Sequence, residues 1–131
     1  TNMNIIGIIQ ARMNSVRFPN KMMASIGKYE VIDWVLRRSK CSKLISKLIL
    51  ATSSNTENDY LINKAKKNSI EYFRGSEDDV LSRFVIIAKK EKADIIVRIC
   101  ADNPFISPIE IDRAIKFFID KNPDYVFNHI P

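Results

Sequence analysis

The sequence is poor in the residues on which several common classes of site depend. Its 131 residues include one histidine, His129, and two cysteines, Cys41 and Cys100, which lie far apart and form no Cys-x-x-Cys pair. A zinc hydrolase, a Ser-His-Asp triad and a histidine phosphotransfer centre all need histidines that this chain lacks. The cysteines suit neither a zinc ribbon nor a secreted disulfide scaffold, so we expect a reducing, cytoplasmic setting.

Glycine is also scarce, which excludes the common phosphate-binding loops. The three glycines are Gly7, Gly27 and Gly75, and neither GxxxxGK[ST] nor GxGxxG occurs. Any phosphate site must therefore use cationic side chains. No apolar run approaches the roughly 20 residues that cross a bilayer, and no basic segment precedes the short apolar stretch at the start. The sequence predicts neither a membrane anchor nor a signal peptide.

The residues that are present indicate one globular α/β domain with an uneven charge. Apolar residues make up 46% of the chain and charged residues 27%, so we expect residues 1–131 to form part of a single domain. The net charge is +6, and all of the excess lies in residues 1–65. Such asymmetry is typical of proteins that bind a polyanionic ligand, a nucleic acid or an anionic membrane, and composition alone does not choose among these partners.

Short apolar runs alternate with amphipathic helical patterns along the chain. Buried strands are expected at 4–10, 48–52, 70–73, 95–99 and 125–127. Helices are expected at 30–40, 56–65, 76–88 and 107–119. This alternation predicts right-handed βαβ crossovers and a parallel sheet with helices on both faces. Because the chain stops where the last strand does, we interpret its C-terminus as a cut.

The segment after the first strand carries cations where a ligand would bind. In open parallel sheets, ligands bind beyond the carboxyl ends of the strands. Residues 11–21 break the periodicity and include Arg12, Ser15, Arg17 and Lys21. Arginine can hold phosphate oxygens with two parallel hydrogen bonds, and lysine adds a mobile charge. The loop therefore suits a triphosphate, although a merely solvated basic loop has the same composition.

The segment after the fourth strand offers a metal ligand. Arg98 interrupts the apolar run IIVRIC, and Asp102 follows in the turn Ala-Asp-Asn-Pro. A charge in a buried strand must be paired or leave through the strand's end, so we expect an acidic partner for Arg98. One carboxylate, together with substrate phosphate oxygens, can hold Mg²⁺. Asp102 has two open interpretations: a magnesium ligand, or an ion-pair partner that fixes the loop.

The third strand is followed by Gly75, which allows a close approach of the backbone to a ligand. Ser76 is expected to cap the next helix, and Asp78 and Asp79 in its first turn are explained by the helix dipole.

Four segments of the sequence resemble a known family. The stretches IIQARMNSVRFPNK, LATSSN, FRGSEDDVLSRF and VRICADNPFISP are similar to motifs of the cytidylyltransferase-like family, which includes spore coat polysaccharide biosynthesis proteins and the acylneuraminate and 3-deoxy-manno-octulosonate cytidylyltransferases. The resemblance implies a three-layer α/β/α sandwich of the nucleotide-diphospho-sugar transferase type, with a mostly parallel sheet. It also implies transfer of CMP from CTP to a sugar or sugar acid, with release of pyrophosphate, in cell-surface polysaccharide or glycan biosynthesis.

The same likeness implies roles for individual residues. The expected nucleotide-binding set is Ala11, through a backbone contact to the base, with Arg12, Ser15, Arg17, Lys21, Thr52, Ser53, Arg74 and Asp79. Arg12, Lys21 and Asp102 are expected to carry catalysis, with Asp102 as the Mg²⁺ ligand. Expected partners are CTP and a sugar acceptor. Family members are longer, and their additional part supplies the sugar pocket and a contact that allows a homodimer.

Other functions stay open at this point. A noncatalytic nucleotide-binding domain would keep the same cations, and another nucleoside triphosphate with a sugar phosphate would suit the same loop. A glycosyltransferase of related fold would usually need an Asp-x-Asp metal motif, which is absent. A nucleic-acid-binding module would interleave aromatic and basic residues, and this chain does not. We therefore expect neither a nucleic acid nor a membrane as partner.

Overall fold

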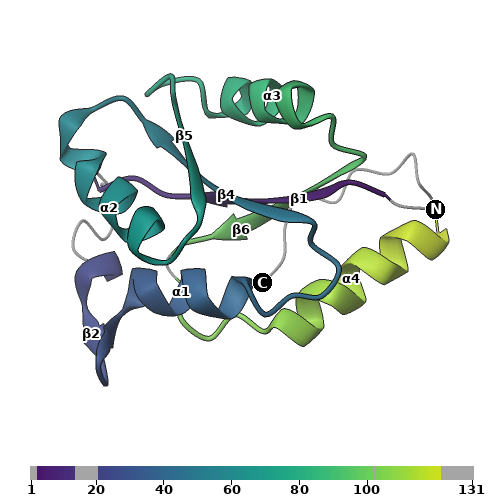
Figure 1. Cartoon of the computed structure of the whole chain (residues 1–131), viewed down its shortest axis with the longest axis horizontal. Helices are drawn as coiled ribbons and strands as arrows, with labels where there is room; N and C mark the ends of the chain where they lie inside the picture. Colours follow the sequence, from purple (N-terminus) through teal and green to yellow (C-terminus); the bar gives the residue numbers. More distant parts are fainter. Residues whose placement is uncertain (1–2, 14–20, 102, 122–131) are drawn as a thin grey trace.

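The computed structural model describes residues 3–13, 21–101 and 103–121, and a parallel sheet lies at their centre. Its four strands, β1 (Ile5–Gln10), β4 (Lys47–Ser53), β5 (Glu71–Gly75) and β6 (Ile95–Cys100), lie in the order β5-β4-β1-β6, all parallel (Figure 1). The helices are α1 (Val31–Ser39), α2 (Asp59–Lys67), α3 (Val80–Glu91) and α4 (Pro108–Lys121). The predicted α/β class with a parallel sheet is confirmed.

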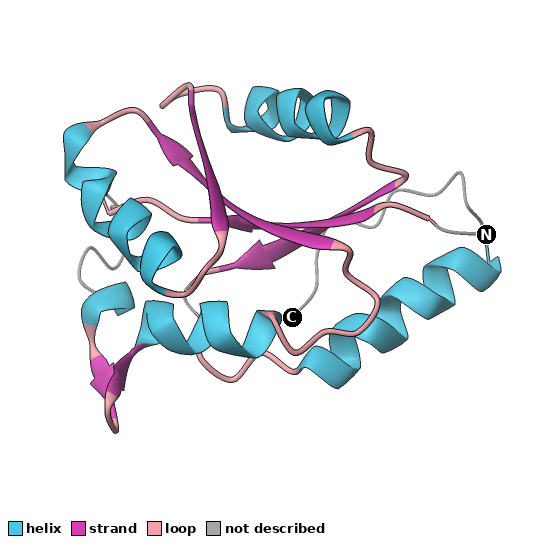
Figure 2. Cartoon of the chain, viewed as in Figure 1, coloured by secondary structure: helices cyan, strands magenta, loops and turns pink. Residues whose placement is uncertain are grey.

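Helices cover both faces of this sheet, so the molecule has three layers. Of the helices in the described residues, α3 covers one face, and α1, α2 and α4 lie on the other (Figures 1 and 2). The alternation of side chains along β1 explains the two cores: Ile5 and Ile9 pack in the cluster that includes α1, α2 and α4, whereas Ile6 and Ile8 pack with Ile87 of α3. A strand buried on both faces reads as a continuous apolar run, which is why β1 was recognisable from sequence.

A short hairpin precedes α1, and the sequence did not predict it. β2 (Ser25–Ile26) and β3 (Tyr29–Glu30) pair antiparallel around Gly27, whose φ is +64° (Figure 2). Trp34 of α1 anchors the hairpin, because its Nε1 donates to the carbonyl of Ile26 at 2.8 Å. Glycine with positive φ in a two-residue loop is a hairpin signal. Strands of only two residues, however, are too short to show the alternation of apolar and polar residues by which a strand is recognised in a sequence.

The expected start of the third helix was wrong. α3 begins at Val80, and the carboxylate of Asp79, rather than Ser76, caps it by accepting from the N–H of Ser82 at 3.0 Å. Ser76 instead accepts from the N–H of Asp79, so residues 76–79 form a separate turn. The expected strand at 70–73 is observed at Glu71–Gly75, and the expected helix at 56–65 opens with a 3-10 turn, η2 (Thr56–Asn58), before α2.

The predicted strand at 125–127 lies outside the described residues. Another 3-10 turn, η1 (Lys21–Met23), precedes the hairpin. Within the described ranges, no helix is both long and apolar enough to span a bilayer.

Candidate functional site

The carboxyl ends of the four strands form one edge of the sheet, which we call the carboxyl rim. Gln10 at the end of β1 is in register with Ala51 of β4 and with Cys100 of β6, and Ser53 of β4 is in register with Gly75 of β5. The segments that follow these strands therefore meet at the rim. These segments carry the residues predicted to bind a nucleotide.

A chain of hydrogen bonds ties the segment after β1 to the end of β4. The N–H of Met13 donates to Oδ1 of Asn58 at 2.8 Å, and Nδ2 of Asn58 donates to Oγ of Ser53 at 2.6 Å. Asn58 and Ser53 are both fully buried. Asn58 was missed from sequence because an isolated asparagine after a strand carries no signal of a partner 45 residues away. Its role here is to fix where the segment after β1 leaves the sheet.

At the end of β5, the side chain of Arg74 donates hydrogen bonds from all three nitrogens of its guanidinium group. Nε donates to the carbonyl of Ser53 at 3.2 Å, and Nη2 donates to the carbonyl of Asn55 at 2.8 Å. Nη1 forms an ion pair with Asp59 at 2.7 Å. These contacts hold the end of β5 against the turn that follows β4. Arg74 therefore positions the turn that follows β4. The predicted contacts of Arg74 and Ser53 with a nucleotide stay predictions.

The other predicted site residues differ in what the structure says of them. The N–H of Ala11 donates to the carbonyl of Ala51 at 3.1 Å, and its expected backbone contact with a base stays a prediction. Thr52 is fully buried, and its Oγ1 has no hydrogen-bond partner within the described part of the chain. Asp79 is exposed and caps α3.

Arg12 is exposed at the start of the segment that follows β1. Lys21 begins η1, and its side chain is not described. Ser15, Arg17 and Asp102 lie outside the described residues. Their predicted roles, including Asp102 as the metal ligand, stay predictions.

Arg98 does not meet the expectation of an acidic partner within the described residues. Its side chain is exposed, and its guanidinium carbon lies 5.8 Å from the centre of the Phe84 ring in α3. The charge is thus tolerated because that position of β6 is open to solvent, where cation–π contact with Phe84 adds a modest stabilisation. Asp102, the partner weighed from sequence, is not among the described residues.

Sequence reasoning missed one cation at the rim, Arg83. It lies in α3 and is fully buried, and its Nε and Nη2 donate to the carbonyls of Ser76 and Glu77 at 2.7 and 3.1 Å. Burial lowers the pKa of Arg83, and the nearby positive charge of Arg12 lowers this pKa further, while Glu77 raises it. The signal was present in the sequence: position 83 falls on the inward stripe of α3 with Phe84 and Ile87.

Gly75 explains how the stem of Arg83 is accommodated. A Cβ atom at Gly75 would lie 3.1 Å from Cγ of Arg83 and 2.8 Å from Cε2 of Phe73. The close approach at Gly75 is thus to these two side chains, and the expected approach of its backbone to a ligand stays a prediction.

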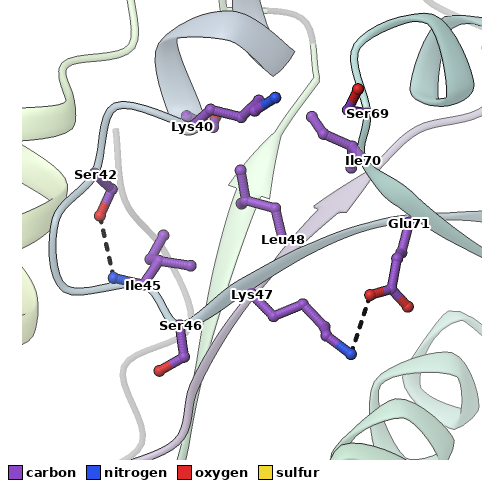
Figure 3. A pocket seen from close by; sticks show the side chains of 10 residues that line it. Lys40, Ser42, Ile45, Ser46, Lys47, Leu48, Ser69, Ile70 and Glu71 are labelled. Atoms are coloured by element: carbon purple, nitrogen blue, oxygen red, sulfur yellow. Dashed lines mark hydrogen bonds and ion pairs between the residues drawn. The ribbon is translucent and has the colours of Figure 1, made fainter.

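Two hollows in the described part of the chain lie at the opposite edge of the sheet. The one in Figure 3, of about 230 Å³, is lined by residues at the starts of β4 and β5, including Lys47 and Glu71. Its cations already have partners: Lys47 pairs with Glu71 at 3.0 Å and with Glu91 at 2.9 Å, and Lys40 donates to the carbonyl of Asn68. The adjoining hollow is lined by Arg37, Lys40 and residues 67–69. Among the described residues, buried polar atoms without a partner occur at both edges: Oγ of Ser39 belongs to a residue that lines the first hollow, whereas Oε1 of Gln10 and Oγ1 of Thr52 belong to residues at the ends of β1 and β4.

Comparison with known proteins agrees with this architecture. The model of the cytidylyltransferase family matches residues 6–130. The spore coat polysaccharide biosynthesis protein SpsF of Bacillus subtilis is 36% identical over 128 residues, which cover 95% of this chain and 53% of that protein. The chain spans about half the length of the curated relatives it matches.

Solved structures share the fold. A cytidylyltransferase from Leptospira borgpetersenii superposes with a TM-score of 0.86 at 33% identity, over 92% of this chain and 50% of that one. A CMP:2-keto-3-deoxy-manno-octonic acid synthetase, solved in complex with CTP, superposes with a TM-score of 0.74 at 21% identity, over 90% and 48% of the two chains. The predicted three-layer fold and the predicted resemblance are both confirmed, and the chain belongs to the cytidylyltransferase family.

Proposed function

We propose that this chain forms the nucleotide-binding part of an enzyme that transfers CMP from CTP to a sugar or sugar acid and releases pyrophosphate. The observation that carries the proposal is the register of β1 with β6 in a chain of the cytidylyltransferase family. Gln10 and Cys100 are neighbours across the two strands, and Arg12 and Asp102 each follow two residues later in the sequence. Such neighbouring strand ends are where α/β sheets bind ligands.

The sugar acceptor and the pathway are also part of the proposal. The Bacillus subtilis relative is described as a spore coat polysaccharide biosynthesis protein, which supports a role in cell-surface polysaccharide or glycan biosynthesis. Cys41 and Cys100 are free, as suits a cytoplasmic enzyme.

The residues at the rim suit a metal that arrives with the triphosphate. In the described part of the chain, no group of three or more His, Cys, Asp or Glu side chains gathers as a complete metal cage. Mg²⁺ does not need one, because it binds through one or two carboxylates plus waters and substrate phosphate oxygens. Asp102 is the carboxylate we propose for it. When bound, Mg²⁺ would neutralise negative charge on the phosphate oxygens.

The proposed reaction is an in-line substitution at the α-phosphorus of CTP. A hydroxyl oxygen of the acceptor forms a bond to this phosphorus, the bond to the bridging oxygen breaks, and pyrophosphate leaves with that electron pair. The hydroxyl proton passes to water. Arg12 and Lys21 would hold the phosphate oxygens and stabilise the charge that develops on them, so positioning and electrostatics supply most of the rate.

The test is pyrophosphate release by the full-length protein with CTP, UTP, GTP or ATP and a panel of sugar acids and sugar phosphates. We expect release with CTP and one acceptor class. Arg12→Ala should lower this rate, whereas Arg113→Ala, which removes an exposed cation from α4, should not. Nucleotide binding without release for any acceptor would support the noncatalytic alternative, and release only with another triphosphate would contradict the choice of CTP.

A further inference from the structure

Asn58 occupies a helix-capping position, but its side chain does not cap the helix. It directly precedes α2, and although the first turn of α2 lies within the described residues, the amide of Asn58 forms no hydrogen bond with it. Asparagine is a preferred N-cap residue because its side chain can accept from N–H groups of that turn. Here Oδ1 instead accepts from the N–H of Met13 at 2.8 Å, and Nδ2 donates to Oγ of Ser53 at 2.6 Å. The amide thus links the segment after β1 to the end of β4.

The surroundings of Asn58 hold these two bonds in place. Asn58 and Ser53 are both fully buried. The Ser53 hydroxyl also accepts from the N–H of Asn55 at 3.3 Å, and the N–H of Asn58 donates to the carbonyl of Asn55 at 3.0 Å. Arg74 holds the same turn from β5 through the carbonyls of Ser53 and Asn55. Such a buried network resists movement, because breaking a bond leaves a buried donor or acceptor unpaired.

The bond to Met13 fixes the main chain next to Arg12. On one side of Arg12, the N–H of Ala11 donates to the carbonyl of Ala51 in β4 at 3.1 Å. On the other side, the N–H of Met13 donates to Asn58. The side chain of Arg12 is exposed and forms no hydrogen bond or ion pair with another described residue. Arg12 therefore combines a backbone that is tied down on both sides with a guanidinium that the described residues leave unbonded.

We propose that Asn58 is a positioning residue for the nucleotide: by holding Met13, it sets where the guanidinium of Arg12 meets the phosphate oxygens. The inference rests on the proposed contact of Arg12 with CTP and deepens it. A binding group works best when neighbouring residues hold it within about 0.5 Å of its productive position, and a fixed backbone lowers the entropy cost of binding. Asn58 needs no contact with the nucleotide, and Ser53, predicted from sequence as such a contact, braces Asn58.

A residue that merely stabilises the fold would show the same hydrogen bonds, but it would affect binding in a different way. A positioning residue acts on CTP through Arg12, so its effect should disappear when the guanidinium is absent. General loosening of the rim would weaken binding by the same factor with or without that guanidinium. A double-mutant cycle distinguishes these cases, because it measures whether the effects of two substitutions are independent.

The test measures CTP binding to the full-length protein by calorimetry, for the wild type, Asn58→Ala, Arg12→Ala and the double variant. We expect Asn58→Ala to weaken CTP binding by about tenfold, within the range for residues coupled through one hydrogen-bond network. In the Arg12→Ala background the same change should cost less than about twofold. Asn63→Ala is the matched control, because it removes an exposed amide from the middle of α2, and it should leave CTP affinity unchanged.

A second variant keeps the proposal testable if Asn58→Ala does not fold, which urea denaturation would reveal. Ser53→Ala removes the partner of the Asn58 Nδ2 and leaves the bond to Met13 in place without its brace. We expect a smaller loss of CTP affinity, of about threefold, and this loss should also disappear in the Arg12→Ala background. A loss that persists there would show that the pair does not act through Arg12 and would overturn the proposal.

The remaining outcomes separate this role from the proposed function. Equal losses from Asn58→Ala in both backgrounds would indicate a structural role and overturn the proposal, as would unchanged affinity in Asn58→Ala. Unchanged CTP affinity in Arg12→Ala would contradict the proposed nucleotide loop and, with it, this role of Asn58. Coupling between Asn58 and Arg12 without pyrophosphate release for any acceptor would support the positioning role while contradicting the proposed transferase activity.

Discussion

Replacement of Arg74 by methionine separates a positioning role from a direct contact with the nucleotide. The side chain of Arg74 is 28% exposed, and it bonds the carbonyls of Ser53 and Asn55 and the carboxylate of Asp59. Arg74→Met keeps most of the aliphatic stem and removes all three bonds. We expect the end of β5 and the turn after β4 to separate more easily, because these bonds link them.

The expected loss of stability follows from the exposure of each partner. A hydrogen bond from a charged donor contributes about 1.5 to 3 kcal/mol when buried, so two partly exposed bonds to carbonyls should contribute about 2 to 3 kcal/mol together. The ion pair with Asp59 adds less than about 1 kcal/mol, because the Asp59 side chain is 60% exposed and well screened. The total is about 2 to 4 kcal/mol.

Urea denaturation without nucleotide measures this loss. Asp59→Asn removes only the ion pair and should lower the free energy of unfolding by less than about 1 kcal/mol. Arg113→Met is the matched control, because its ion pair with Glu110 is exposed on both sides, and it should change stability very little. If Arg74→Met unfolds like the wild type yet binds CTP more weakly, Arg74 is a nucleotide contact and the positioning argument is refuted.

Three further predictions concern the loop, the metal and a buried ion pair. Arg12→Ala and Lys21→Ala should each weaken CTP binding in calorimetry by about 1.5 to 3 kcal/mol with little change in the free energy of unfolding; unchanged affinity in both would remove the loop from the site. Asp102→Asn should reduce the enhancement of CTP binding by Mg²⁺ more than metal-free binding, and equal enhancement in titrations of variant and wild type would favour an ion-pair role for Asp102. Burial alone would raise the pKa of Asp33, but hydrogen bonds from Lys64, Asn68 and the N–H of Glu30 outweigh it and lower this pKa. Asp33 should therefore stabilise the fold above about pH 4 and lose this effect as the pH falls further, so unfolding free energy should fall more steeply from pH 5 to 3 in the wild type than in Asp33→Asn.

Elements whose signals are local were the ones that sequence predicted well. The apolar run of β1 and the stripe of Ile111, Ile115 and Phe118 in α4 record burial directly in residue order. The start of α3 was misplaced because Ser76 and Asp79 are both good caps, and the choice between them depends on contacts elsewhere. The guanidinium of Arg83 donates hydrogen bonds to the carbonyls of Ser76 and Glu77, and the sequence rules for helix capping do not take such side-chain contacts into account.

The candidate site divides in the same way. Arg12 and Thr52 could be assigned to the rim from sequence, because each follows or ends a strand and parallel strands share a carboxyl edge. Asn58 could not, since its partners belong to other elements of the chain. For Arg83 the helical stripe indicates an inward position, but it does not indicate which carbonyls the guanidinium bonds. Residue type suggests that a side chain can bind a ligand, but it does not say which of its atoms the fold has already used.

The amino-acid order by itself determined the alternation of strands and helices, the parallel sheet and the edge at which cations gather, because hydrophobic periodicity and strand direction are properties of neighbouring residues. Only the tertiary structure decided which cationic side chains already use all of their hydrogen-bond donors within the protein. Arg74 uses every nitrogen on Ser53, Asn55 and Asp59, whereas Arg83 keeps one buried N–H without a partner in the described residues. The physical reason is that a guanidinium bonds whichever oxygens surround it, and packing of β4, β5 and α3 places those oxygens.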